Sequence, residues 1–372
     1  MSPPAADTGG GRRILLVTAT ARRRGAEIQA SQLAQQFRRR GRRVDVVALS
    51  EGTDGERLPI TVLGRRRLGP RTLWQLRRRS RHADVVVAYG SSTLPACIMA
   101  LIGGRTAFVY RSISDPGRWL RGPVHRLVTR FQYRRPAAIV ALWDGAAASI
   151  TELFGVPASR LAVIPNARDP VQFRPPSAEA RAWARDVLGL AASDVVVAFV
   201  GSLSDEKRPD VAIEAMRERP DHVLLVAGAG PLRADAEALA ERVAPGRVRF
   251  LGEVGDVIPV LHAADVVLIT SAVEGMPGVA IEALMSGVPV LATGVGALST
   301  MRGVEVVDPT AEAFARALGG VRPALPLDVA AEWGWPAVTD RWLDLLEGPL
   351  VAPRPPQAAR TLAANASHTR ST

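Results

Sequence analysis

Two glutamates that stand eight residues apart, Glu274 and Glu282, are the side chains whose spacing most suggests chemistry. Glu274 follows the strand expected at 264–270, whose apolar run 266–269 is typical of a buried strand in a parallel sheet. Glu282 lies in the helix expected next, among otherwise apolar residues. Eight helical residues rise about 12 Å, which is roughly the distance between the sugar and the ribose of a nucleotide-sugar. The alternative is structural, with Glu274 as a helix cap and Glu282 as a surface residue.

The segment between the two glutamates has the features of an anion site. Pro277 suits the first turn of a helix, and Gly287 is placed to end that helix. The backbone N–H groups of Met276, Gly278 and Val279 then have no partner within the helix. A helix N-terminus surrounded by small residues binds anions, so this segment predicts a diphosphate site.

These residues resemble the E-x7-E signature of the retaining glycosyltransferases of the GT-B fold, of the family 4 type. The matching residues are Glu274-Gly275-x-Pro277-Gly278 and Glu282-Ala283-x-x-x-Gly287-x-Pro289-Val290. The resemblance implies that Glu274 contacts the transferred sugar. It also implies that Glu282 accepts hydrogen bonds from the ribose hydroxyls.

A second part of the resemblance follows the expected strand 195–200. In the family, an Arg and then a Lys neutralise the departing diphosphate, and a cation at that place lowers the barrier by roughly a few kcal/mol. Here Gly201 ends the strand, Ser202 stands where the Arg is common, and Lys207 matches the Lys. Ser202 is expected to donate one hydrogen bond in place of the Arg. The alternative for Lys207 is an ordinary surface turn.

Other contacts to the donor follow from the same resemblance. Gly252, Glu253 and Val254 form a turn whose backbone and neighbours contact the base in relatives, so these three residues are expected to contact the base. In the first strand-to-helix loop only Gly25 of the usual glycine pair is present, with Arg24 in the other place. Arg24 and Gly25 either meet a phosphate or form a solvated basic turn.

The acceptor side departs from the family. Many relatives have a His after the strand expected at 106–110, but none occurs between His82 and His125. Arg111 or Asp115 is a candidate replacement, and the acceptor stays open. The five His show no metal-ligand spacing, and there is no Asp-x-Asp pair, so we expect no metal and no cofactor apart from the co-substrate.

The fold class expected from the resemblance is α/β, a GT-B protein with two doubly wound Rossmann-like domains facing across a cleft. A chain of 372 residues is too long for one ordinary core. The expected parts are a disordered N-terminus (1–11), an N-terminal acceptor-side domain (12–176) with a returning helix (about 333–348), a nucleotide-sugar-binding domain (177–332) and a disordered tail (351–372).

The charge is distributed unevenly. Residues 1–180 have a net charge of +18 and residues 181–372 a net charge of −7. A basic helix is expected at 65–81, either as a solvated surface or as a contact with an anionic membrane. The single cysteine, the polar start and the absence of an apolar run of about 18 residues predict a cytoplasmic protein, with peripheral contact at the inner face of the membrane as a further hypothesis.

The function expected is a metal-independent, retaining transfer of a sugar from a UDP- or GDP-linked donor to a hydroxyl acceptor that is lipid-linked, part of the cell envelope, or a small molecule. One alternative is a nucleotide-sugar epimerase of the same fold, although no further acid–base group is evident. Another is a non-catalytic basic binding protein. Nucleic acid is not expected as a partner, because the arginine runs lack interleaved aromatic residues.

Overall fold

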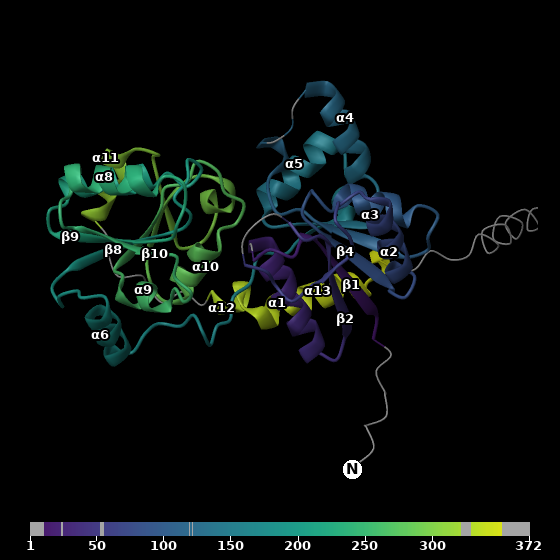
Figure 1. Ribbon diagram of the computed structural model, residues 1–372, viewed down its shortest axis with the longest axis horizontal. Coiled ribbons are helices and arrows are strands. Elements are labelled where there is room, and N and C mark those ends of the chain that lie inside the picture. The colour runs from purple at the N-terminus through teal and green to yellow at the C-terminus, as the bar shows by residue number, and fades with distance from the viewer. Residues whose placement is uncertain are drawn as a thin grey trace, which may run out of the picture. The chain divides into compact units, whose positions relative to one another are not determined.

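The chain divides into two compact α/β units (Figure 1). The computed structural model describes residues 11–23, 25–52, 56–118, 120, 122–320 and 329–351, without the side chains of Arg118 and Leu350. Unit 1 comprises Met1–Ala141, Ala147–Val163 and Thr339–Thr372, and unit 2 comprises Leu142–Ala146 and Ile164–Val338. Both ends that the sequence predicts to be disordered lie outside the described residues, except for Gly11 and Val351.

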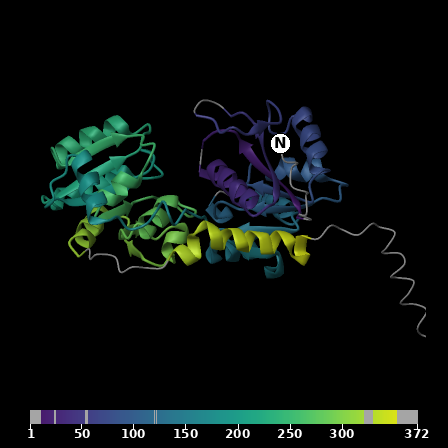
Figure 2. The same cartoon turned by 90° about the horizontal axis from the view of Figure 1, so that it is seen from below.

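The division between the units falls at Val163. The segment 164–176, which the sequence assigns to the first domain, is therefore part of unit 2. The returning helix is α13 (Trp335–Glu347), and its residues from Thr339 onward belong to unit 1 (Figure 2). There Trp342 is buried and stacks on Tyr89, with ring centroids 6.3 Å apart.

Unit 1 contains a seven-stranded parallel sheet of order β3-β2-β1-β4-β5-β6-β7. Its strands are β1 (Arg13–Thr20), β2 (Arg43–Ser50), β3 (Thr61–Val62), β4 (Val85–Tyr89), β5 (Ala107–Arg111), β6 (Ala138–Ala141) and β7 (Leu161–Val163). Its central strand β4 is buried along its whole length, as is usual where helices cover both faces of a parallel sheet. Short apolar runs in the sequence predict strands at 44–49, 83–88, 106–110 and 137–142, and the strands of the structure agree with these bounds within two residues.

The helices of unit 1 depart further from the sequence-based expectation. They are α1 (Gly25–Arg39), α2 (Pro70–Ser80), α3 (Leu94–Leu101), α4 (Gly122–Tyr133), α5 (Asp144–Phe154, its first three residues in unit 2) and the larger part of α13. The basic helix expected from Arg65 begins only at Pro70, because proline at the first helical position and extended Gly69 before it mark a helix start. No helix was expected at α3, α4 or α5.

Unit 2 contains a six-stranded parallel sheet of order β10-β9-β8-β11-β12-β13. Its strands are β8 (Val195–Val200), β9 (His222–Ala227), β10 (Val248–Gly252), β11 (Val266–Ile269), β12 (Val290–Thr293) and β13 (Val304–Val307). Successive residues of β8 alternate between two cores: Val196 and Ala198 pack in one, and Val197 and Phe199 in the other. Both faces of this sheet are therefore covered, which is the doubly wound arrangement.

The helices of unit 2 cover the two faces of this sheet. They are α6 (Ala178–Val187), α7 (Pro209–Ala215), α8 (Arg233–Val243), α9 (Ile258–Ala263), α10 (Gly278–Met285), α11 (Ala311–Leu318) and α12 (Ala330–Trp333). The helix between the two glutamates is confirmed, but Pro277 is its N-cap and not part of its first turn. Gly287, with φ of +74°, follows its end as expected, because glycine adopts the left-handed conformation without strain.

Candidate active site

The candidate site of unit 2 lies where the strand order of the sheet reverses. Strands β8 and β11 are neighbours in the sheet but not in the sequence, and the helices that follow them, α7 and α10, pack in the two different cores. Open α/β sheets bind ligands at such a switch point. The loop after β8 contains Gly201, Ser202 and Lys207, and the loop after β11 contains Glu274. The topology therefore brings together the two residues to which the sequence assigns catalytic roles.

Lys207 and Glu274 form a direct ion pair. The Lys207 Nζ donates to Glu274 Oε1 at 2.5 Å, and the Ser271 hydroxyl donates to the same oxygen at 2.8 Å. The Glu274 side chain is only 9% exposed, whereas that of Lys207 is 27% exposed. Thus one oxygen of a mostly buried carboxylate accepts from two donors, and the ammonium that it pairs with stays partly open to solvent.

Backbone contacts hold both loops in place. The buried Thr270 hydroxyl donates to the carbonyl oxygens of Lys207 and Arg208, at 3.0 and 2.7 Å. The Ala272 N–H donates to the Glu206 carbonyl at 2.8 Å. Arg208 has a φ of 50°, which is uncommon for a residue with a side chain. These bonds fix the position from which Lys207 extends, so its reach toward Glu274 does not depend on its flexible side chain alone.

The segment 294–297 packs on the backbone beside Glu274. The Ala297 N–H donates to the Gly275 carbonyl at 2.8 Å. A Cβ at Gly296, where φ is +60°, would lie 2.4 Å from the Glu274 carbonyl oxygen. Only glycine allows this approach, so Gly296 lets the loop after β12 support the glutamate.

The predicted glycine contacts lie along the carboxyl edge of the same sheet. The Gly201 N–H donates to the Ala227 carbonyl, and the Gly228 N–H donates to the Gly252 carbonyl, at 3.0 and 2.7 Å. A Cβ at Gly228 would lie 1.8 Å from the Gly201 carbonyl oxygen. The turns after β8, β9 and β10 are thus packed backbone to backbone. Such an edge is suited to a ligand that approaches the main chain closely.

The remaining predicted contacts differ in exposure. Ser202 is exposed, and its hydroxyl lies 3.1 Å from that of Ser204. Glu253 is exposed, and Val254 is half-buried and packs against the core. Both follow the edge strand β10, two strands away from Lys207 in the sheet order.

Helix α10 begins beside this edge. The side chain of Met276 is buried in the core, and that of Val279 packs against it, so only the backbone of these residues is suited to an anion. The Asn166 side-chain amide donates to the Met276 carbonyl at 2.9 Å. The segment that contains Asn166 therefore holds the entry to the helix.

Arg168 is the residue that sequence reasoning missed. Its Nε donates to Glu282 Oε1, and the Arg168 and Glu282 side chains are 17% and 14% exposed. An arginine Nη atom occupies the space of a Cβ on Gly278, the first residue of α10. The guanidinium therefore lies across the start of the helix and contacts the glutamate predicted to hold the ribose. Arg168 and Glu282 are 114 residues apart, so no local sequence signal relates them.

The backbone of Arg168 is fixed independently of its side chain. Its N–H donates to the Trp333 carbonyl at 2.9 Å, and its carbonyl accepts from the Trp335 N–H at 3.1 Å. These bonds form an isolated β-bridge to Gly334. The guanidinium is thus placed over α10 by a rigid anchor.

Three other predicted residues lie in unit 1. Gly25 is the exposed first residue of α1, and nothing lies within 4 Å of a Cβ built on it; Arg24 lies outside the described residues. Arg111 is buried and packs over the ring of Trp342, 5.5 Å from its centroid, and burial lowers its pKa to about 10. Arg111 therefore packs as a core residue and is a poor replacement for a solvent-accessible His. Asp115 is half-buried and accepts from the Gly117 N–H at 2.9 Å.

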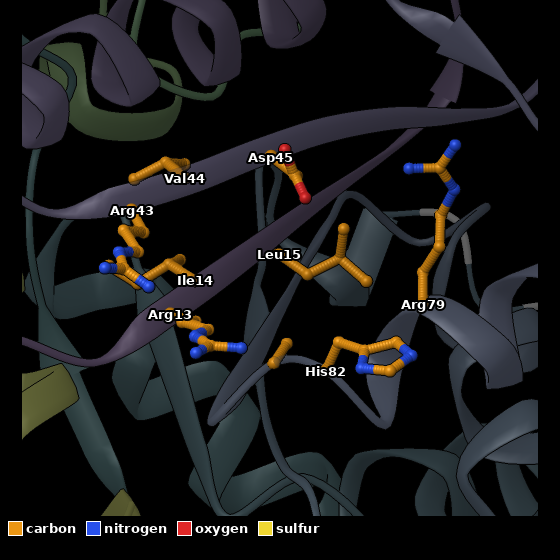
Figure 3. A pocket seen from close by; sticks show the side chains of 9 residues that line it. Arg13, Ile14, Leu15, Arg43, Val44, Asp45, Arg79 and His82 are labelled. Carbon is orange, nitrogen blue, oxygen red and sulfur yellow. The ribbon is translucent and has the colours of Figure 1, made fainter.

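A pocket of about 350 Å³ in unit 1 is separate from these residues. Figure 3 shows Arg13, Arg43, Arg79 and His82 among the residues that line it, together with Asp45. It lies at the amino ends of β1 and β2, whereas open α/β sheets bind ligands at the carboxyl ends. Among the described residues, no group of three or more His, Cys, Asp or Glu could hold a metal ion.

Two known family models match the sequence of this chain, one in each half. Residues 23–172 match the family model described as Glycosyltransferase Family 4, and residues 194–321 match the one described as Glycosyl transferases group 1. The two matches support a GT-B glycosyltransferase of the family 4 kind.

Two curated relatives illustrate the sequence similarity. The chain is 40% identical over 168 residues to a D-inositol 3-phosphate glycosyltransferase of Nocardia farcinica, a match that covers 41% of this chain and 37% of that protein. It is 34% identical over 197 residues to a 2-deoxystreptamine glucosyltransferase of Streptomyces kanamyceticus, a match that covers 51% of each chain. The chain therefore spans about half the length of these relatives, or less.

Solved structures confirm the predicted fold class. Anabaena Alr3699/HepE in complex with UDP has a TM-score of 0.79 at 19% identity, over 90% of this chain and 99% of that one. Sucrose-phosphate synthase from Thermosynechococcus elongatus has a TM-score of 0.73 at 20% identity, over 90% of this chain and 98% of that one. The fold is GT-B, with one Rossmann-like sheet in each unit.

Proposed function

We propose that this protein is a metal-independent, retaining glycosyltransferase that moves a hexosyl group from a nucleotide-diphosphate sugar to a hydroxyl acceptor. The observation that supports this best is the ion pair between Lys207 and the mostly buried Glu274 at the β8–β11 switch point. A lysine that only faces solvent does not need a buried carboxylate that a second donor also holds in place. A lysine that must meet a departing diphosphate needs a fixed position.

At the anomeric carbon, the proposed reaction makes one bond and breaks one, and a proton moves from the acceptor to the leaving diphosphate. The acceptor oxygen bonds to the anomeric carbon as the bond from that carbon to the diphosphate oxygen breaks. The acceptor proton passes to the leaving diphosphate on the same face of the sugar, so the configuration is retained and no separate base is required. Lys207 stabilises the negative charge that grows on the diphosphate, and Glu274 orients the sugar.

The first turn of α10 would bind the other side of the diphosphate through its free N–H groups. Glu282 would accept hydrogen bonds from the ribose hydroxyls. Gly201, Gly252, Glu253 and Val254 would then lie along the nucleotide, and Ser202 would donate to a phosphate oxygen.

Arg168 has two roles in this proposal. Through its contact with Glu282 it orients the carboxylate that receives the ribose. Through its place over Gly278 it supplies a positive charge beside the helix start. The second role would compensate for Ser202, which stands where the family has an Arg.

UDP is the nucleotide to test first, because the solved relative HepE has been determined with UDP and with UDP-glucose. The protein would be incubated with UDP-glucose, and with GDP-mannose in parallel, together with D-inositol 3-phosphate or 2-deoxystreptamine as acceptors. Release of UDP or GDP that depends on the acceptor supports transfer. Release from the donor alone, or no release with any pair, counts against it.

The matched variants are Glu274→Gln in the site and Glu305→Gln on the exposed strand β13. Turnover should fall by roughly 100-fold or more in the first variant and stay unchanged in the second. Proton NMR of the product reports the anomeric configuration. An inverted product would refute the same-face mechanism and leave glycosyl transfer standing.

Peripheral contact with an anionic membrane is a second part of the proposal. The support is the net charge of +18 over residues 1–180. Within the described ranges, no helix combines the length and apolar character needed to span a bilayer. A lipid-linked hydroxyl would then be an acceptor within reach of such a surface.

A further inference from the structure

Helix α4 of unit 1 exposes its apolar side chains. Val124, Leu127, Val128 and Phe131 follow the spacing i, i+3, i+4, i+7 and therefore form one stripe. They are 74%, 70%, 47% and 53% exposed. A helix that packs only on its own unit buries such a stripe. Here the buried residues of α4 are Thr129 and Tyr133, so the helix faces the core with these two residues and faces solvent with its apolar stripe.

In the stretch of sequence that contains the stripe, the charged side chains are all arginines. Residues 116–143 contain no Asp or Glu, whereas they contain six Arg. Arg126 and Arg130 are exposed on α4 itself, and Arg134 and Arg135 follow its end. The Arg135 guanidinium lies over the Phe131 ring, 4.2 Å from its centroid. In the sequence, arginines thus lie on both sides of the apolar stripe, and no carboxylate residue lies between them.

We infer that α4 is the membrane-docking element of this protein and lies in the interface of an anionic bilayer. This inference rests on the proposed membrane contact and names the residues that make it. The stripe would enter the boundary between headgroups and acyl chains, and the arginines would contact lipid phosphates. A second copy of the chain fits less well, because two α4 helices in a symmetric contact would place arginine against arginine.

The basic helix α2 is the alternative that the sequence suggested, and it has a different surface. Trp74 is 60% exposed, with Arg78 over its ring at 5.7 Å, but Leu76 is buried. Within α2, Trp74 is thus a single apolar contact point and not a stripe. Anionic lipid would attract α2 by charge, while apolar insertion favours α4.

Flotation of the full chain with vesicles tests this assignment. The vesicles contain either phosphatidylcholine alone or phosphatidylcholine with about 30% phosphatidylglycerol, at physiological ionic strength. The matched variants replace exposed apolar residues by serine without changing charge: Leu127→Ser with Phe131→Ser in α4, and Trp74→Ser in α2. The floating fraction with phosphatidylglycerol should fall at least fivefold in the α4 variant and less than twofold in the α2 variant.

Each other outcome has a definite meaning. Loss of flotation in the α2 variant with retention in the α4 variant would overturn the assignment while membrane contact stands. Absence of wild-type flotation would overturn both, and equal flotation on neutral vesicles would overturn the role of charge. A dimer in solution that the α4 variant abolishes would make a second copy the occupant. Release of UDP from soluble substrates, measured on the same variants, tests the transferase proposal separately.

Discussion

Replacement of Arg168 by alanine should weaken nucleotide-diphosphate binding by about 10- to 150-fold. Arg168 makes a charge-assisted contact to Glu282 and lies across Gly278 at the start of α10. A hydrogen bond to a charged group contributes about 1.5–3 kcal/mol, which converts into that range of dissociation constants. Because the arginine side chain is only 17% exposed, solvent and salt screen this interaction less than at an open surface.

Calorimetric titration with UDP, with GDP in parallel and with uridine separates the two roles of Arg168. Uridine has the ribose but no phosphate. If the guanidinium only orients Glu282, Arg168→Ala should weaken uridine and UDP equally. If it also meets the diphosphate, the loss for UDP should be at least fivefold larger than the loss for uridine.

Gly278→Ala tests the same idea without removing a charge. The added methyl group would occupy the place of the Arg168 Nη atom, which is the far end of a flexible side chain and can move away. Alanine also favours the helix more than glycine does. Gly278→Ala should therefore weaken UDP binding while thermal stability is kept.

Arg217→Ala is the control, since Arg217 forms an exposed pair with Glu214 on the surface of unit 2. It should bind UDP as the wild type does. Circular dichroism melting verifies that each variant is folded. A UDP dissociation constant for folded Arg168→Ala within about twofold of wild type would refute the proposed contact, because even the lower energy estimate predicts about tenfold.

Three further predictions concern catalysis, packing and thiol chemistry. Lys207→Ala should lower turnover by roughly 100-fold or more and KM much less, as measured by UDP release; a change confined to KM would argue for simple binding. Gly228→Ala should lower the free energy of unfolding by roughly 3 kcal/mol or more, because its Cβ would lie 1.8 Å from the Gly201 carbonyl oxygen; an unchanged urea midpoint would contradict this. Burial raises the pKa of the Cys97 thiol to about 12. Ellman's reagent should therefore label the native protein slowly at mildly alkaline pH, and it should label one thiol per chain after unfolding. Rapid labelling of the native protein would show that the thiol is accessible.

The strands could be predicted because their sequence signal is local. A strand buried on both faces needs a continuous apolar run, and the runs at 195–200 and 222–227 match β8 and β9 to the residue. Helix α3 has only eight residues, and α4 exposes its apolar stripe to solvent, so their patterns do not identify a core-facing helix. Helix α2 begins later than expected because Gly69-Pro70 outweighs the arginine-rich stretch before it.

The candidate site was only partly accessible from the sequence. The motif containing Glu274 and Glu282 suggested their importance, and Lys207 was notable as the single lysine. That Lys207 meets Glu274 follows from strand order, because β8 and β11 are neighbours only in the folded sheet. Arg168 is 114 residues before Glu282, and no local pattern relates the two.

The sequence by itself therefore determined the number of α/β halves, the main strands and the types of residue that could handle a nucleotide-sugar. Local periodicity and motif spacing contain that information, since each depends on residues within one or two elements. The tertiary structure alone decided which charges pair, that Arg111 lies in the core, and that α4 rather than α2 has the exposed apolar stripe. Those outcomes depend on the order of the strands in each sheet and on which face of each helix packs against the core. Contacts between residues far apart in the chain determine both the strand order and the helix packing.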